Sequence, residues 1–87
     1  GWIELHWSPP SGSLLVDSYE VQKRLVVSDS LESMKWETVT NTCQNTRYLV
    51  QELRPCAQYE FRVRALTFDG WSSFSEVGGK YTTGRRH

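Results

Sequence analysis

Between positions 59 and 65, apolar and charged residues alternate one by one along the chain. The odd positions in this stretch are apolar, namely Tyr59, Phe61, Val63 and Ala65. The even positions between them are charged, namely Glu60, Arg62 and Arg64. Successive side chains of a strand point to opposite faces, so this pattern predicts a strand with one buried and one solvent-facing side.

The same period of two recurs along the rest of the chain and is interrupted by turn-forming residues. Examples of these breaks are Ser8-Pro9-Pro10, Asn41 to Asn45, and Asp69-Gly70. We expect strands at 1–7, 17–27, 34–40, 46–52, 58–67 and 76–83. Short strands separated by turns about every 8–12 residues are typical of an all-β sandwich or barrel.

Length and charge limit the classes of function that fit this chain. Its 87 residues are enough for one domain, and 10 Lys plus Arg balance 10 Asp plus Glu. A formal net charge of zero argues against nucleic acid as a partner, because no general attraction to phosphate follows from it. No apolar run approaches the roughly 20 residues of a membrane span, so we expect no direct membrane insertion.

The spacing of the large residues resembles that of a fibronectin type III domain over nearly the whole chain. Ile3, Leu5 and Trp7 before Ser8-Pro9-Pro10 resemble its second strand. Later segments resemble its third to sixth strands, its corner and its last loop: Tyr19 and Val21; Trp36 and Val39; Tyr48, Val50, Leu53, Pro55, Tyr59, Phe61, Val63 and Ala65; Gly70, Ser72 and Ser75.

This resemblance implies an immunoglobulin-like β-sandwich of two antiparallel sheets. The domain would span residues 1–84, with 85–87 as a linker or tail. The residues expected to form the core or support the frame are Trp7, Tyr19, Val21, Trp36, Tyr48, Leu53, Pro55, Tyr59, Phe61 and Val63. Trp7 would supply the largest buried area, and the Tyr59 hydroxyl would satisfy backbone groups at the corner after Pro55.

One departure from the family concerns its first strand, which precedes the buried tryptophan by some fifteen residues. Trp7 stands only six residues after Gly1, so we expect that strand to be missing or truncated. Three explanations remain open: the sequence begins inside the domain, a neighbouring molecule supplies the strand, or the natural domain lacks it. The second would give an edge-strand dimer through residues 1–7, and Trp2 would then contact the partner.

The two cysteines flank one expected strand. About seven residues of extended chain would separate Cys43 from Cys56 by more than the roughly 7 Å that a disulfide spans. We therefore expect free thiols. Free thiols and the lack of an Asn-x-Ser/Thr glycosylation site favour an intracellular location, with the cell surface as the alternative.

No constellation of catalytic, metal-ligating or cofactor-binding residues is present in the sequence, so we expect a domain that is not an enzyme and needs no cofactor. The segment that could contact a partner is Trp71-Ser72-Ser73-Phe74-Ser75. Trp71 follows a turn and would either anchor a partner or fold down over the sheet. The segment also resembles the Trp-Ser-x-Trp-Ser box of class I cytokine receptors, with Phe74 in place of the second tryptophan.

In that receptor family the rings of the box alternate with strand arginines, which here would be Arg62 and Arg64. The charged faces of two expected strands would otherwise form ordinary cross-strand pairs. The sequence thus indicates a non-catalytic module of a multidomain protein that spaces its neighbours and contacts an unidentified protein partner. The alternative is the ligand-binding ectodomain of a cell-surface receptor.

Overall fold

In the computed structural model the predicted alternation of buried and outward residues is clearest at residues 3–6 and 58–67. The structure describes residues 1–10, 15–26, 35–78 and 81–83. Its elements in chain order are β1 (Ile3–His6), β2 (Ser18–Val26), β3 (Glu37–Cys43), β4 (Arg47–Val50), β5 (Gln58–Thr67), β6 (Gly70–Trp71), β7 (Ser75–Glu76) and β8 (Tyr81–Thr82). The predicted tail at 85–87 and the end of the domain at 84 lie outside the described residues.

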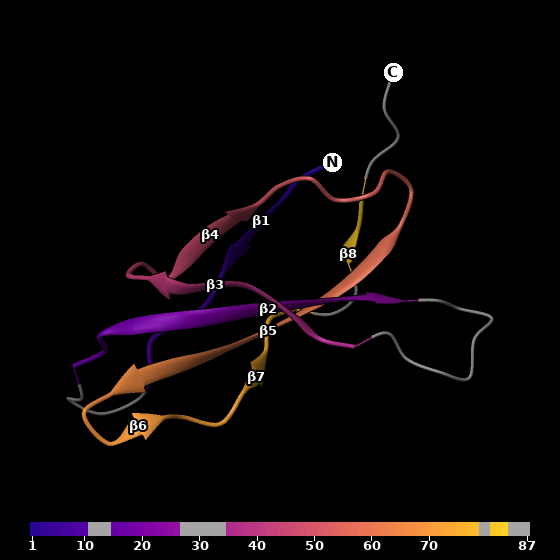
Figure 1. Ribbon diagram of the computed structural model, residues 1–87. Coiled ribbons are helices and arrows are strands. Elements are labelled where there is room, and N and C mark those ends of the chain that lie inside the picture. Colours follow the sequence, from indigo (N-terminus) through magenta and orange to yellow (C-terminus); the bar gives the residue numbers. More distant parts are fainter. Residues whose placement is uncertain (11–14, 27–34, 79–80, 84–87) are drawn as a thin grey trace.

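The strands form two antiparallel sheets that face each other (Figure 1). One sheet pairs β1 with β4, and the other has the order β3-β2-β5-β6, with β7 and β8 also paired to β5. The central pair of the larger sheet, β2 and β5, is in register from Ser18 opposite Leu66 to Val26 opposite Gln58. This arrangement is the expected β-sandwich.

The core lies between the sheets and is built from the inward positions of each strand. Phe61, Leu5, Val21 and Val50 have the largest fully buried side chains. Burying a residue of this kind stabilises the fold by roughly 1.5–3 kcal/mol relative to exposure. Trp7 is only half-buried, and its ring meets that of Tyr19 edge to face at 5.5 Å between centroids.

The corner before β5 follows the sequence prediction. The backbone N–H of Arg54 donates to the hydroxyl of Tyr59 over 3.0 Å, while the Tyr59 ring is buried in the core. Leu53 is buried beside it, whereas Pro55 is exposed on the surface of the corner. The tyrosine therefore satisfies a backbone donor that the turn leaves without a strand partner.

Two strand predictions were wrong in extent. Residues 41–43 were expected in a turn, but they continue β3 as far as Cys43, which pairs with Tyr19 through irregular register. The last strand, expected unbroken at 76–83, is divided into short pieces that begin with β6 at Gly70. The turn into β6 comprises Phe68 and Asp69, with Gly70 at φ 104° as its final residue.

Both cysteines are free thiols, as expected, with Cys43 buried and Cys56 exposed.

Among the described residues, β1 pairs with β4 alone. The amide of Trp7 donates to the carbonyl of Thr46 over 2.9 Å, so the backbone N–H and C=O groups of Trp7 point toward the chain of β4. The backbone groups of the alternate residues Trp2, Glu4 and His6 consequently point to the opposite edge of β1.

Candidate interaction surface

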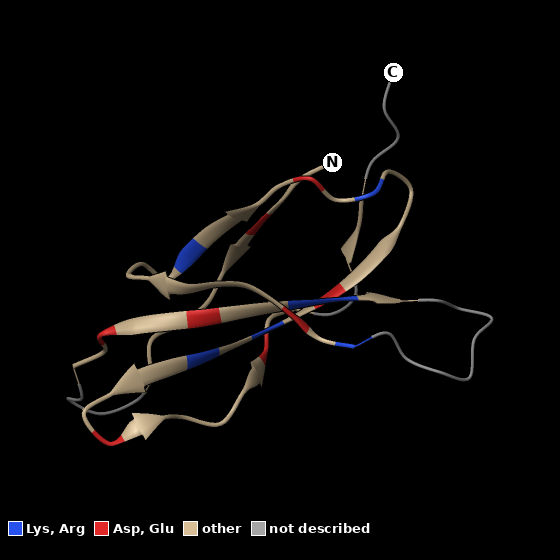
Figure 2. Ribbon diagram, in the orientation of Figure 1, with Lys and Arg blue, Asp and Glu red and all other residues tan. Residues whose placement is uncertain are grey.

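The outward face of the larger sheet carries cross-strand polar pairs at alternate positions of β2 and β5. Glu20 stands opposite Arg64, Gln22 opposite Arg62, and Arg24 opposite Glu60. Each pair is bonded, with Arg64 Nε donating to Glu20 Oε1 over 2.6 Å, Arg62 Nε to Gln22 Oε1 over 2.8 Å, and Arg24 Nη2 to Glu60 Oε1 over 2.6 Å. Figure 2 shows the interleaved charges along both strands.

The three arginines of these pairs also alternate with aromatic rings. Trp36 lies between Arg24, at 4.5 Å from the ring centroid, and Arg62, at 4.4 Å. Phe74 lies between Arg62, at 4.0 Å, and Arg64, at 4.7 Å. Arg64 then lies 4.5 Å from the ring of Trp71. We call the series Arg24, Trp36, Arg62, Phe74, Arg64 and Trp71 the cation–aromatic ladder.

A β-bulge explains how Trp71 and Phe74 reach the same face. Residues three apart on a regular strand point to opposite faces, because the side-chain period is two. Here Trp71 pairs with Leu66, but Ser75 pairs with Val63, so the register moves by one residue between β6 and β7. The additional residue turns Phe74 outward, which is the usual effect of a bulge on side-chain direction.

Ser72 forms hydrogen bonds with the backbone of β5 in the gap between β6 and β7. Its amide donates to the carbonyl of Ala65 over 2.8 Å, and its hydroxyl accepts from the amide of Ala65 over 2.9 Å. The same hydroxyl donates to the carbonyl of Ser73 over 3.2 Å. A side-chain oxygen thus replaces a backbone acceptor, so β5 keeps its bonding at the point where the chain leaves it.

Electrostatics couple the ladder to the carboxylates below it. Burial alone would raise the pKa of Glu20, but hydrogen bonds from Thr38, Arg64 and Gln22 together outweigh it and hold that pKa below its ordinary value. Burial, together with the positive charges of Arg24 and Arg64, lowers the pKa of the Arg62 guanidinium. Since Arg62 bonds to an amide rather than a carboxylate, it is the arginine of the ladder without an ion pair among the described residues.

The structure brings together four of the predicted contact residues, Arg62, Arg64, Trp71 and Phe74, but not Trp2. Trp2 is exposed on the outer side of the smaller sheet. Trp36, predicted in the core, lies instead in the ladder, because it precedes β3 and its ring packs between guanidinium groups. The sequence pattern therefore gave no sign that Trp36 belongs to this surface, whereas the outward positions of β2 were consistent with Arg24 on it.

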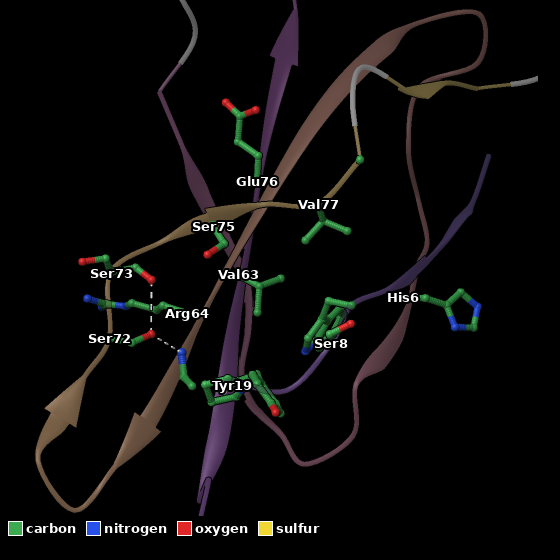
Figure 3. Close-up of a pocket in the computed structure, with 14 residues that line it drawn as sticks. His6, Ser8, Tyr19, Val63, Arg64, Ser72, Ser73, Ser75, Glu76 and Val77 are labelled. Atoms are coloured by element: carbon green, nitrogen blue, oxygen red, sulfur yellow. Dashed lines mark hydrogen bonds between the residues drawn. The ribbon is translucent and has the colours of Figure 1, made fainter. Parts of the chain in front are cut away.

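A cleft of about 350 Å³ opens between the sheets beside the ladder (Figure 3). One wall is formed by His6, Trp7 and Ser8, and the other by residues between Ser72 and Gly78. Tyr19 and Val63 line its floor. The indole Nε1 of Trp7, on one wall of the cleft, is buried without a hydrogen-bond partner among the described residues.

Within the described part of the chain, no group of three or more His, Cys, Asp or Glu residues is placed to hold a metal ion. The same residues contain no helix long and apolar enough to cross a membrane.

Comparison with a family model gives a match to the fibronectin type III domain over residues 1–78. Among curated proteins, the chain is 31% identical over 84 residues to human interleukin-6 receptor subunit beta, a match that covers 92% of the chain and 9% of that protein. It is 34% identical over 82 residues to human Roundabout homolog 2, covering 93% of the chain and 6% of that protein.

Among solved structures, the chain resembles the twitchin kinase region from C. elegans (Fn31-NL-kin-CRD-Ig26) with a TM-score of 0.79 and 27% identity. This match covers 95% of the chain and 14% of the other. The chain spans less than a tenth of the length of the two curated relatives, interleukin-6 receptor subunit beta and Roundabout homolog 2.

Proposed function

Because the chain belongs to the fibronectin type III family, we propose that it is a non-catalytic module that spaces its neighbours and contacts a protein partner. Modules of this family occur in multidomain proteins that include a receptor subunit and a kinase region, and they are generally non-catalytic. A contact with neighbouring domains of the same chain is part of this proposal.

The observation that most supports contact with a partner is that Trp71 is both packed in place and exposed. Its ring is fixed against Arg64 at 4.5 Å, yet 39% of the residue stays exposed. A large side chain that is already ordered loses little conformational freedom on binding, so more of its contact energy appears as affinity. Tryptophan is also enriched among the residues that dominate binding at protein interfaces.

A photo-crosslinking experiment on the parent protein tests this proposal. Phe68, exposed next to β6, is replaced with p-benzoylphenylalanine, and Leu49, exposed on the smaller sheet, receives the same replacement as a control. A discrete cross-linked protein from position 68 and none from position 49 is the expected result. Equal yields from both positions, or none from position 68 in cells that carry out the protein's role, would contradict the proposal.

The ladder favours a second candidate function, a receptor ectodomain. The resemblance of Trp71-Ser72-Ser73-Phe74-Ser75 to a receptor box is accompanied by the stacking of its rings on Arg62 and Arg64. Labelling of intact cells with an impermeant amine reagent distinguishes the two. Label on the parent protein before permeabilisation supports an ectodomain, and label only afterwards supports an intracellular module.

An edge-strand dimer through residues 1–7 is a separate proposal. It is supported by the backbone groups of Trp2, Glu4 and His6, which point to the edge of β1 that has no partner strand among the described residues. Sedimentation over a range of concentrations is the test. A dimer that dissociates in the Glu4→Pro variant is the expected result, because proline removes a donor from that edge. A monomer at every concentration would contradict the dimer.

A further inference from the structure

Trp71 differs from the other rings of the ladder in having an arginine on one side alone. Trp36 and Phe74 each lie between two guanidinium groups, whereas Arg64 is the one cation found over Trp71 in the described chain. The next outward residue of β5 is Leu66, which stands directly opposite Trp71. The ladder therefore changes at this point from alternating charge to apolar surface.

Two further exposed apolar residues belong to segments at the same end of the sheet. Leu15 is 86% exposed and Phe68 is 82% exposed. The amide of Asp17 donates to the carbonyl of Leu66 over 2.8 Å, which brings the segment before β2 alongside the turn that contains Phe68. We call Leu15, Phe68 and Trp71 the apolar tip. Exposed apolar groups that gather in one place commonly mark an interaction site.

The charges beside the apolar tip that have no ion-pair partner among the described residues are negative. Asp17 and Asp69 are exposed, and neither forms an ion pair within the described residues. The nearest cation of the ladder, Arg64, is already neutralised by Glu20 at 2.6 Å. Figure 2 shows acidic positions at the start of β2 and in the turn between β5 and β6. A positively charged partner is therefore attracted to this end, and an acidic one is repelled.

We propose that the apolar tip docks a segment of a protein partner that presents an apolar side chain flanked by arginine or lysine. The apolar side chain packs on Phe68 and Trp71, and the flanking cations lie near Asp17 and Asp69. The ladder itself supplies the precedent for a guanidinium beside a ring, with Arg64 at 4.5 Å from Trp71. This inference rests on the proposed partner contact and adds the chemistry of the partner.

Peptide probes test the inference on the 87-residue chain. The ¹⁵N-labelled protein is titrated with acetyl-Arg-Leu-Arg-amide, acetyl-Gly-Leu-Gly-amide and acetyl-Glu-Leu-Glu-amide. The basic peptide is expected to shift the amide signals of Leu15, Asp17 and Phe68 to Trp71 at the lowest concentration. Replacing both Asp17 and Asp69 with asparagine should weaken its binding about three- to tenfold, while the control Glu4→Gln on the other sheet leaves binding unchanged.

The outcomes separate this inference from the proposed function. Equal binding of the basic and acidic peptides overturns the basic partner, even where cross-linking from position 68 still captures a protein. Shifts confined to residues away from the apolar tip overturn the docking surface. If the same amides shift on concentrating the protein without peptide, the apolar tip binds a second copy of the chain, and the inference is wrong. Salt-sensitive binding of the basic peptide at the tip supports it.

Discussion

The Nε–H of Arg64 donates to Oε1 of Glu20 over 2.6 Å, and this ion pair joins the centre of the larger sheet to the rings above it. Glu20 is buried, and it also accepts from the hydroxyl of Thr38 over 2.7 Å. The pair therefore fixes the guanidinium that Phe74 and Trp71 pack against. The positions of the Phe74 and Trp71 rings on the outward face therefore depend on the carboxylate of Glu20.

The stability of the fold should fall with acid because of Glu20. Its pKa is lower when folded than its ordinary value of 4.5, so the stabilisation is fully present above that pH. It is lost as the pH falls from 4.5 through the folded pKa. The difference in unfolding free energy between wild type and Glu20→Gln should therefore shrink below pH 4.5. Urea unfolding at several pH values measures it, and a constant difference would contradict the assignment.

Removal of one arginine from the middle of the ladder should destabilise the domain. Arg62→Ala takes away contacts with Trp36 and Phe74, and a loss of about 1–2 kcal/mol is expected. Arg47→Ala is the matched control, since Arg47 lies on the other sheet, outside the ladder. Thermal unfolding of both variants is the measurement. Equal melting temperatures for Arg62→Ala and wild type would show that the stack contributes nothing.

The corner tyrosine offers a test of a single hydrogen bond. Tyr59→Phe leaves the Arg54 amide without the acceptor that lies 3.0 Å away, and a loss of about 1 kcal/mol or more is expected. Tyr48→Phe serves as the control, because the described residues give its hydroxyl no such bond. Denaturant unfolding compares the two variants. Equal losses would mean that the Tyr59 hydroxyl has no special role at the corner.

Two glycines should respond differently to alanine. Gly70 has φ 104°, but a Cβ at this position would meet open space, so Gly70→Ala suffers backbone strain of about 1 kcal/mol and no collision. Gly78 has φ 66°, and a Cβ there would also collide with the hydroxyl of Tyr81. Gly78→Ala should therefore be the more destabilised variant in thermal unfolding. The reverse order would contradict the placement of Tyr81.

The thiols should differ in reactivity under native conditions. Cys56 is exposed and should react rapidly with a thiol reagent, whereas buried Cys43 should react only as the protein opens. Titration of the unreduced protein should show one fast thiol, and a second after denaturation. The Cys56→Ser variant, which lacks the fast phase, identifies the residue. No reactive thiol after denaturation would indicate a disulfide.

Alternation alone predicted the faces of β2 and β5, because a period of two assigns each side chain unambiguously. It could not predict the ladder. Trp36 stands before β3, outside any regular period, and Phe74 reaches the outward face only through the bulge after Ser72. The resemblance to a receptor box indicated Arg62 and Arg64 but gave no reason to include Arg24. Sequence therefore predicted the frame better than its surface.

The interruption between β6 and β7 also bears on solubility. β5 meets two-residue strands at Gly70–Trp71 and Ser75–Glu76, and the pairing register moves by one residue between them. A long, flat edge would invite another chain to add to the sheet, whereas short and bulged pieces give an intruding strand no continuous register. The same irregularity that places Phe74 among the rings of the ladder thus leaves this margin of the sheet a poor template for strand addition.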